Sequence, residues 1–461
     1  MQRLRQNPLA SAAAIALAAV TGTLVAQPSL KTTALLGVFM ACAMIALTLE
    51  APIVAYGALA LILALASEER VDDRLGLTGP VYGTSLGGIS IPLALTAVLV
   101  FALGVQKNAQ RSRWPGAPIT VLAMLVGVAI FSSVLAGSVT DNLFVVRPLF
   151  ILLLASLGGY WVTQQNGVDL PLKVLVAAAG IAFLPGLYNS FSTGNLSYYD
   201  ASYIYLIGTV ATLVLFRAVD IGVIRIPFVL LSALVIMLSF RRGAMLAVAV
   251  TLVVTGLVSG RVGFRASVWL ILASALVIEL VSPGSIYGQI ERLATYFTGS
   301  TGQDENVNYR KYETANAWLN VKEHPVWGIG PTADWIVYRT FDGRFRALGT
   351  DYLHNSYLWV WLRYSVVGLV LFIAFLATSA IVLIRRSSPI VSLAVGASML
   401  GLAVTLVTGS SLTTTTRWPL IVGLMLGIAL AAGAERDLPS EHGRFPAGEE
   451  ISTRRSPTAP V

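Results

Sequence analysis

Two adjacent arginines and one histidine stand where their side chains could do chemistry. Arg241 and Arg242 interrupt an otherwise apolar run between residues 227 and 259. Arginines near membrane depth are costly, so they usually face a partner or a cavity. The planar guanidinium fork suits two parallel hydrogen bonds to a phosphate. We therefore predict an anion-binding role for at least one of the two.

His354 directly precedes a long apolar segment and is the histidine best placed for proton transfer. His324 stands at the end of an expected helix, where a capping role suffices, and His442 lies in a polar tail. An imidazole can accept a proton near neutral pH, which suits a general base. An interfacial histidine with a satisfied hydrogen bond is the alternative, and the residues alone leave both open.

The composition indicates that these residues sit in a membrane protein. Apolar residues make up 56% of the 461-residue chain and charged residues 12%, about half the charge of a soluble domain. A helix needs roughly 20 apolar residues to cross the hydrocarbon core. We predict an all-α polytopic fold with 12 to 14 transmembrane helices. The apolar blocks fall at 9–26, 33–49, 53–66, 89–105, 117–137, 148–163, 171–187, 203–217, 227–240, 244–259, 266–282, 356–384, 389–408 and 417–434.

The chain is predicted to form one transmembrane domain, residues 1–434, followed by a disordered cytoplasmic tail, 435–461. The first apolar block follows MQRLRQ and is interpreted as a retained helix rather than a cleaved signal. The single cysteine, Cys42, excludes a disulfide or a Cys-based zinc site within one chain. The net charge of +8 is explained by links between spans, so no nucleic-acid partner is expected.

Basic residues predict the orientation in the membrane. If there are 14 spans, five basic clusters fall on one side, which the positive-inside rule makes cytoplasmic. Both termini are then cytoplasmic, and the cytoplasmic membrane is the expected location. The clusters are Arg3 with Arg5; Lys107 with Arg111 and Arg113; Arg217 with Arg225; Arg261 with Arg265; and Arg385 with Arg386. The Arg241–Arg242 link falls on the other, extracytoplasmic side.

The longest link, residues 283–355, is predicted to be an extracytoplasmic loop that carries function. Loops of this length tend to be functional or disordered, and its many aromatic residues argue against disorder. Residues 306–324 predict an amphipathic helix on or near the outer membrane surface. Its apolar stripe is Tyr312, Ala315, Trp318, Leu319 and Lys322, while Arg310, Glu313 and Thr314 fall on another face. Pro325 ends the helix, and the turn HPVWGIGP follows.

Other charged residues are interpreted as structural. Arg147, Arg363 and Arg417 also fall near the outer face, where each is expected to extend along the membrane interface. Asp72 and Asp73 belong to a mixed-charge run, and no cluster of histidines and carboxylates predicts a metal site. The sequence thus favours a site for an anionic lipid headgroup that no bound cation neutralises.

The chain resembles the O-antigen ligase and O-antigen polymerase superfamily in three motifs. An Arg-bearing helix (Arg310) precedes the turn from His324 to Pro331, and a His-Asn-x-x-L motif, His354 to Leu358, opens the next span. Ser239–Phe240–Arg241–Arg242–Gly243 is similar to the family's Ser-Arg-Gly motif with two inserted residues. Arg242 is the preferred equivalent because it directly precedes Gly243. The motifs lie within residues 239–384.

The resemblance implies a metal-independent membrane glycosyltransferase of the C superfamily type, with no cofactor. It would transfer a glycan from a polyprenyl-diphosphate carrier to an acceptor hydroxyl of a glycan or lipid on the outer face. His354 and Arg310 would be catalytic, and Arg242, Arg241 and Arg310 would bind the diphosphate. A polymerase of the same superfamily, which makes an O-antigen or exopolysaccharide, is one alternative. A polysaccharide transporter or lipid-linked glycan flippase is another, as is a metal-dependent transferase that uses Asp72 or Asp73.

Overall fold

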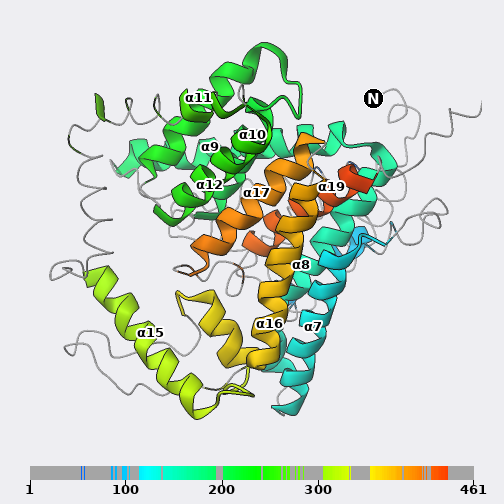
Figure 1. Cartoon of the computed structure of the whole chain (residues 1–461), viewed down its shortest axis with the longest axis vertical. Coiled ribbons are helices and arrows are strands. Elements are labelled where there is room, and N and C mark those ends of the chain that lie inside the picture. Colours follow the sequence, from blue (N-terminus) through cyan, green and yellow to red (C-terminus); the bar gives the residue numbers. More distant parts are fainter. Residues whose placement is uncertain are drawn as a thin grey trace, which may run out of the picture.

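The computed structural model (Figure 1) consists of apolar helices packed side by side, with one polar helix beside them. The structure describes short pieces between residues 53 and 103 and between 263 and 284, together with residues 333, 409 and 412. The continuous described ranges are 114–136, 139–193, 201–239, 242–260, 305–331, 353–386, 389–407 and 417–434. The elements described below lie within these residues.

Most helices follow the apolar blocks of the sequence closely. The apolar helices are α7 (Ala117–Leu135), α8 (Val139–Asn166), α9 (Asp169–Thr193), α10 (Ala201–Leu215), α11 (Arg225–Leu238), α12 (Arg242–Val258), α16 (Ser356–Arg385), α17 (Ile390–Thr405) and α19 (Arg417–Ala434). Of these, α8 begins well before the predicted block 148–163, and α9 ends several residues after the predicted block 171–187. The polar helix is α15 (Glu305–Glu323). A 3₁₀ turn (Gly222–Ile224) precedes α11, and the two-residue strands β1 (Ser85–Leu86) and β2 (Ile89–Ser90) pair antiparallel.

The all-α polytopic prediction is confirmed. Four described helices are long and apolar enough to cross a membrane: Ala117–Leu135, Val145–Asn166, Ser356–Arg385 and Arg417–Ala434. Shorter apolar helices accompany them at Ser202–Leu215, Gly222–Ile236, Gly243–Val258 and Ile390–Thr405. The predicted blocks 9–26 and 33–49 and the predicted tail 435–461 lie outside the described residues.

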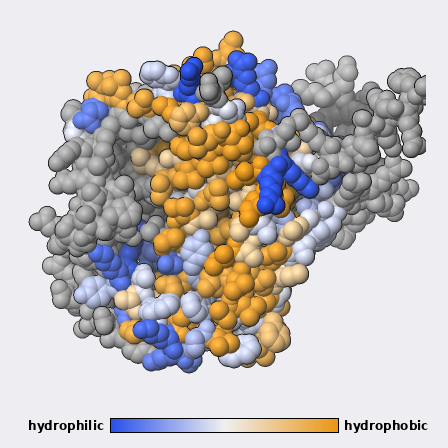
Figure 2. All heavy atoms as spheres, viewed as in Figure 1, coloured by the Kyte–Doolittle hydropathy of each residue, from blue (hydrophilic) through white to orange (hydrophobic). Residues whose placement is uncertain are grey.

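The bundle exposes an apolar surface, as expected for a surface that faces lipid. Figure 2 shows it over the middle of the molecule, on the face where α7 and α16 lie. On these two helices, Phe131 and Leu135 of α7 and Val367 and Val370 of α16 are more than half exposed. Lipid tails, unlike water, solvate such side chains without cost, so the exposed apolar surface fits a multi-pass membrane protein.

Small residues let α8 and α19 pack in close contact. A Cβ atom at Gly423 would lie 2.7 Å from the carbonyl oxygen of Leu152, and Gly427 approaches the backbone of Ser156 in the same way. Close approach at glycines is a common packing mode in membranes. The contacts advance by four residues in both helices, so α8 and α19 run parallel. As the predicted sixth and fourteenth spans, they should run in the same direction, and they do.

Candidate functional site

The buried face of α15 carries three polar side chains. Glu313, Asn316 and Asn320 are buried, while Trp318 is 44% exposed and packs edge-on against Trp361. Asn316 and Asn320 satisfy their amides by donating to the carbonyls one turn earlier, at 3.1 and 2.8 Å. The predicted helix is confirmed to within a residue at each end. The predicted apolar stripe lies on the outer side of the helix. The opposite face, which carries Glu313, packs against the rest of the protein.

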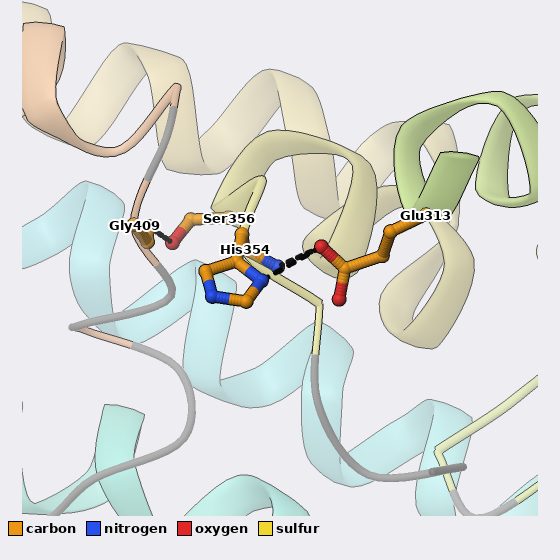
Figure 3. A network of polar contacts seen from close by, with 4 residues as sticks. All are labelled: Glu313, His354, Ser356 and Gly409. Atoms are coloured by element: carbon orange, nitrogen blue, oxygen red, sulfur yellow. Dashed lines mark hydrogen bonds and ion pairs between the residues drawn. The ribbon is translucent and has the colours of Figure 1, made fainter. Parts of the chain in front are cut away.

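His354 is held by Glu313 through two contacts to a single oxygen (Figure 3). Glu313 Oε2 lies 2.8 Å from His354 Nδ1 and accepts the backbone N–H of His354 at 3.1 Å. The Glu313 side chain is fully buried, whereas the His354 side chain keeps 20% of its surface exposed. The imidazole is therefore anchored at Nδ1, while part of the His354 side chain remains exposed.

The backbone next to His354 is fixed by the start of α16. Asn355 caps the helix, because its side-chain oxygen accepts the N–H groups of Tyr357 and Leu358 at 3.0 and 3.1 Å. Ser356 donates its backbone N–H to the carbonyl of Leu406 at 3.0 Å, and its hydroxyl to the carbonyl of Gly409 at 2.6 Å. The segment after α17 therefore lies beside His354, as Figure 3 shows.

The span predicted at 356–384 is broken at Ser365, whose φ of 79° and ψ of 173° are not helical. The break leaves backbone groups unpaired within α16, and the turn after α15 supplies their partners. Leu362 accepts the N–H groups of Ile329 and Gly330 at 2.8 and 3.2 Å. Val366 donates to the carbonyl of Val326 at 3.0 Å. In Figure 1 the bend of α16 accordingly lies beside the end of α15.

Arg363 and Arg417 are buried, so the prediction that they extend along the interface was wrong. Arg363 is 5% exposed, and its Nη1 donates to the carbonyls of Pro331 and Ala333, each at 2.7 Å. Arg417 is fully buried, with its guanidinium 4.5 Å from the centroid of the Tyr203 ring. Both charges find acceptors or a π face inside the bundle, which offsets the cost of removing them from the interface.

Some of the predicted site residues lie on described helices, and others lie outside the described residues. Arg310 is exposed on α15, one helical turn before the Glu313 that contacts His354. Arg242 is the first residue of α12, a helix that packs against α17 where Gly401 meets the backbone of Ala247. Arg241, Asp72 and Asp73 lie outside the described residues. No group of three or more metal-ligating side chains occurs within the part of the chain that the structure describes.

Glu313 is a residue of the candidate site that the sequence did not identify. Its partner is 41 positions away, so no local pattern links the two. One signal was present in the sequence, because Glu313 follows the candidate Arg310 by three residues on the predicted helix and is therefore one turn away from it.

Residues 227–373 match the family of O-antigen ligases. The match begins in α11 and extends through α12, α15, the turn after α15 and the bend of α16. It therefore contains Arg241, Arg242, Arg310, Glu313 and His354, and it confirms the resemblance to that superfamily. No curated protein gives a significant match to the chain.

Proposed function

Since residues 227–373 match the O-antigen ligases, we propose that this multi-pass membrane protein transfers a glycan from a polyprenyl-diphosphate carrier to an acceptor hydroxyl. The observation that carries the proposal is the placement of His354. It is fixed through Glu313 to α15, the helix that also carries the exposed Arg310. A candidate proton acceptor and a guanidinium group are thereby associated with one helix, as this transfer would require.

In the proposed reaction, the acceptor oxygen attacks the anomeric carbon of the carrier-bound sugar. The bond between that carbon and the phosphate oxygen breaks, and the lipid diphosphate leaves with the bonding electrons. His354 takes the proton of the acceptor hydroxyl. Arg310 and Arg242, with Arg241 in support, stabilise the charge that develops on the diphosphate, because guanidinium groups form charge-assisted hydrogen bonds with phosphate oxygens.

The packing of α12 supports a shared site for Arg242 and His354. Gly401 of α17 contacts α12 five residues after Arg242, and Leu406, five residues after Gly401, accepts the N–H of Ser356. As the predicted tenth and thirteenth spans, α12 and α17 should be antiparallel. The start of α12 and the end of α17 are then at the same level, which brings Arg242 toward the start of α16.

The positive-inside pattern supports an orientation for this site. We place the protein in the cytoplasmic membrane, with both termini in the cytoplasm and the ends of α12 and α16 that carry Arg242 and His354 on the outer face. A polyprenyl-linked glycan on that face would meet an acceptor that is itself a glycan or a lipid.

The experiment that tests the proposal compares two histidine variants. The purified protein in lipid nanodiscs is given a synthetic polyprenyl-diphosphate-linked oligosaccharide with a fluorescent label and an acceptor extract from the host membrane. His354→Ala should lower glycan transfer by about 100- to 10,000-fold, the usual contribution of a general base. His324→Ala is the matched control, since His324 is exposed and its described bonds use only the backbone.

A normal transfer rate in His354→Ala, with the protein correctly inserted, would overturn the proposed function. Product length separates the two members of the superfamily. A ligase attaches the supplied glycan once to its acceptor, whereas a polymerase makes long chains from the carrier-linked substrate alone. In sealed proteoliposomes, a labelled lipid that crosses the bilayer without losing its glycan would instead identify the protein as a flippase.

A further inference from the structure

We infer that Glu313 is a positioning residue that fixes the tautomer of His354, so that Nε2 is the nitrogen that takes the acceptor proton. This inference rests on the proposed function, because it assigns the orientation of the base proposed there. It adds a residue that the motifs of the sequence did not mark. The inference depends on which atoms meet at Glu313 and on what surrounds them.

One oxygen of Glu313 receives both contacts. Oε2 accepts the backbone N–H of His354 at 3.1 Å and lies 2.8 Å from Nδ1 of the same residue. An ionised carboxylate only accepts hydrogen bonds, so Nδ1 must carry the hydrogen. A neutral imidazole has a single N–H, so Nε2 is the nitrogen that keeps its lone pair and can take a proton.

The same two bonds fix the orientation of the ring. The backbone bond holds the main chain of His354 against α15, and the Nδ1 bond holds the side chain against the same atom. Rotation of the ring would break the contact to Nδ1. Asn355 and Ser356 hold the following residues through the helix cap and the contact to Leu406, so the backbone cannot follow such a rotation.

The Glu313 carboxylate is buried, so it interacts with protein groups and not with solvent. The whole side chain is buried, and within the described residues no donor reaches its second oxygen, Oε1. A buried carboxylate costs free energy unless it is paired. His354 is the described partner of Glu313, so the two groups form one unit, in the manner of other histidine bases oriented by a carboxylate.

The test combines a spectroscopic and a kinetic measurement on the full-length protein in lipid. The chain has three histidines, so ¹⁵N-histidine spectra of the wild type, His324→Gln and His442→Gln assign the signals of His354. The inference predicts the Nδ1–H tautomer for neutral His354 in the wild type. Glu313→Gln, which can donate to Nδ1, should raise the population of the Nε2–H tautomer.

In the transfer assay, Glu313→Gln should lower kcat roughly 100-fold with little change in the KM for the labelled donor, since it misorients the base without removing an anion-binding group. Glu313→Asp, which keeps the charge, should recover part of that loss. Glu323→Gln is the matched control, because Glu323 is an exposed carboxylate on the same helix. If Glu313→Gln does not fold, Glu313→Asp and the wild-type spectrum still decide the question.

An Nε2–H tautomer in the wild type, or a normal kcat in Glu313→Gln, overturns the inference. These results differ from the failure of the proposed function, in which His354→Ala itself would transfer glycan at the normal rate. Loss of transfer in His354→Ala together with normal transfer in Glu313→Gln would keep the function and remove only the role of Glu313.

Discussion

The amide nitrogen of Val366 lies 3.0 Å from the carbonyl oxygen of Val326, and this bond replaces the one that Val366 would give to Leu362 in an unbroken helix. Leu362 in turn accepts two N–H groups from the same turn. The turn after α15 thus satisfies both sides of the break in α16. His354 lies just before α16, and Glu313 lies on α15. The contact between the turn after α15 and the break in α16 therefore helps to set the distance between these two residues.

The close contact between the turn after α15 and the break in α16 makes Gly328 difficult to replace. Its φ is +68°, and a Cβ atom would lie 2.6 Å from the carbonyl oxygen of Trp361. We expect Gly328→Ala to lower both the thermal midpoint in detergent and the transfer rate. Gly330→Ala is the control, because Gly330 has a φ of +96° but a Cβ atom there would meet nothing within 4 Å. Gly330→Ala should cost about 1–2 kcal/mol from backbone strain alone, and equal midpoints in the two variants would contradict the clash.

Arg310 should be sensitive to the shape of its side chain as well as its charge. Arg310→Lys keeps the positive charge but loses the fork that binds a phosphate through two hydrogen bonds. We expect a loss in kcat/KM of roughly 10-fold or more, as for one charge-assisted hydrogen bond. Lys311→Gln removes a charge at the next position and should change the rate far less. Equal effects would show that only the general field of α15 matters.

Arg242 should contribute more than Arg241. Arg242 directly precedes Gly243 and is the first residue of α12, so we expect Arg242→Gln to lower kcat/KM for the labelled donor more than Arg241→Gln does. Arg265→Gln, an exposed arginine on a predicted cytoplasmic link, should leave the rate unchanged. A larger effect at Arg241 would reverse the assignment and align the superfamily motif with the first arginine.

Turnover should not depend on a divalent cation. In the proposed site the arginines neutralise the diphosphate, so the transfer rate should be the same before and after treatment with EDTA. Asp72→Asn and Asp73→Asn should likewise be active. A rate that falls in chelator and returns with added Mg²⁺ or Mn²⁺ would instead favour the metal-dependent transferase.

The periodic features of the fold could be predicted from the sequence, and the long-range ones could not. Apolar blocks gave the bounds of α7, α10, α16 and α19 to within about two residues, because lipid imposes the pattern on every span. The break at Ser365 had no local signal, since neither proline nor glycine stands there. It depends on a turn more than 30 positions earlier, and so does the burial of Arg363.

In the candidate site, too, the residues in short motifs could be predicted, and the long-range contact could not. His354 and Arg310 were identified because each belongs to a short motif, and the structure relates them through α15. The contact between Glu313 and His354 spans 41 positions, and local periodicity carries no information about it. Burial of a carboxylate also runs against the expectation that charged side chains stay exposed, so composition argued against the residue that matters most to the orientation of His354.

Arg310 and Glu313 lie one turn apart on a single helix, and this has a mechanical consequence. A helix moves as a rod over so short a distance, so a tilt of α15 that draws Arg310 onto a bound diphosphate also displaces the carboxylate that orients His354. Binding of the carrier diphosphate at Arg310 and orientation of His354 by Glu313 therefore both depend on the position of α15. The stretch of α15 from Arg310 to Glu313 must then stay in place while the diphosphate binds, and a substitution that loosens it would weaken donor binding and the orientation of His354 together.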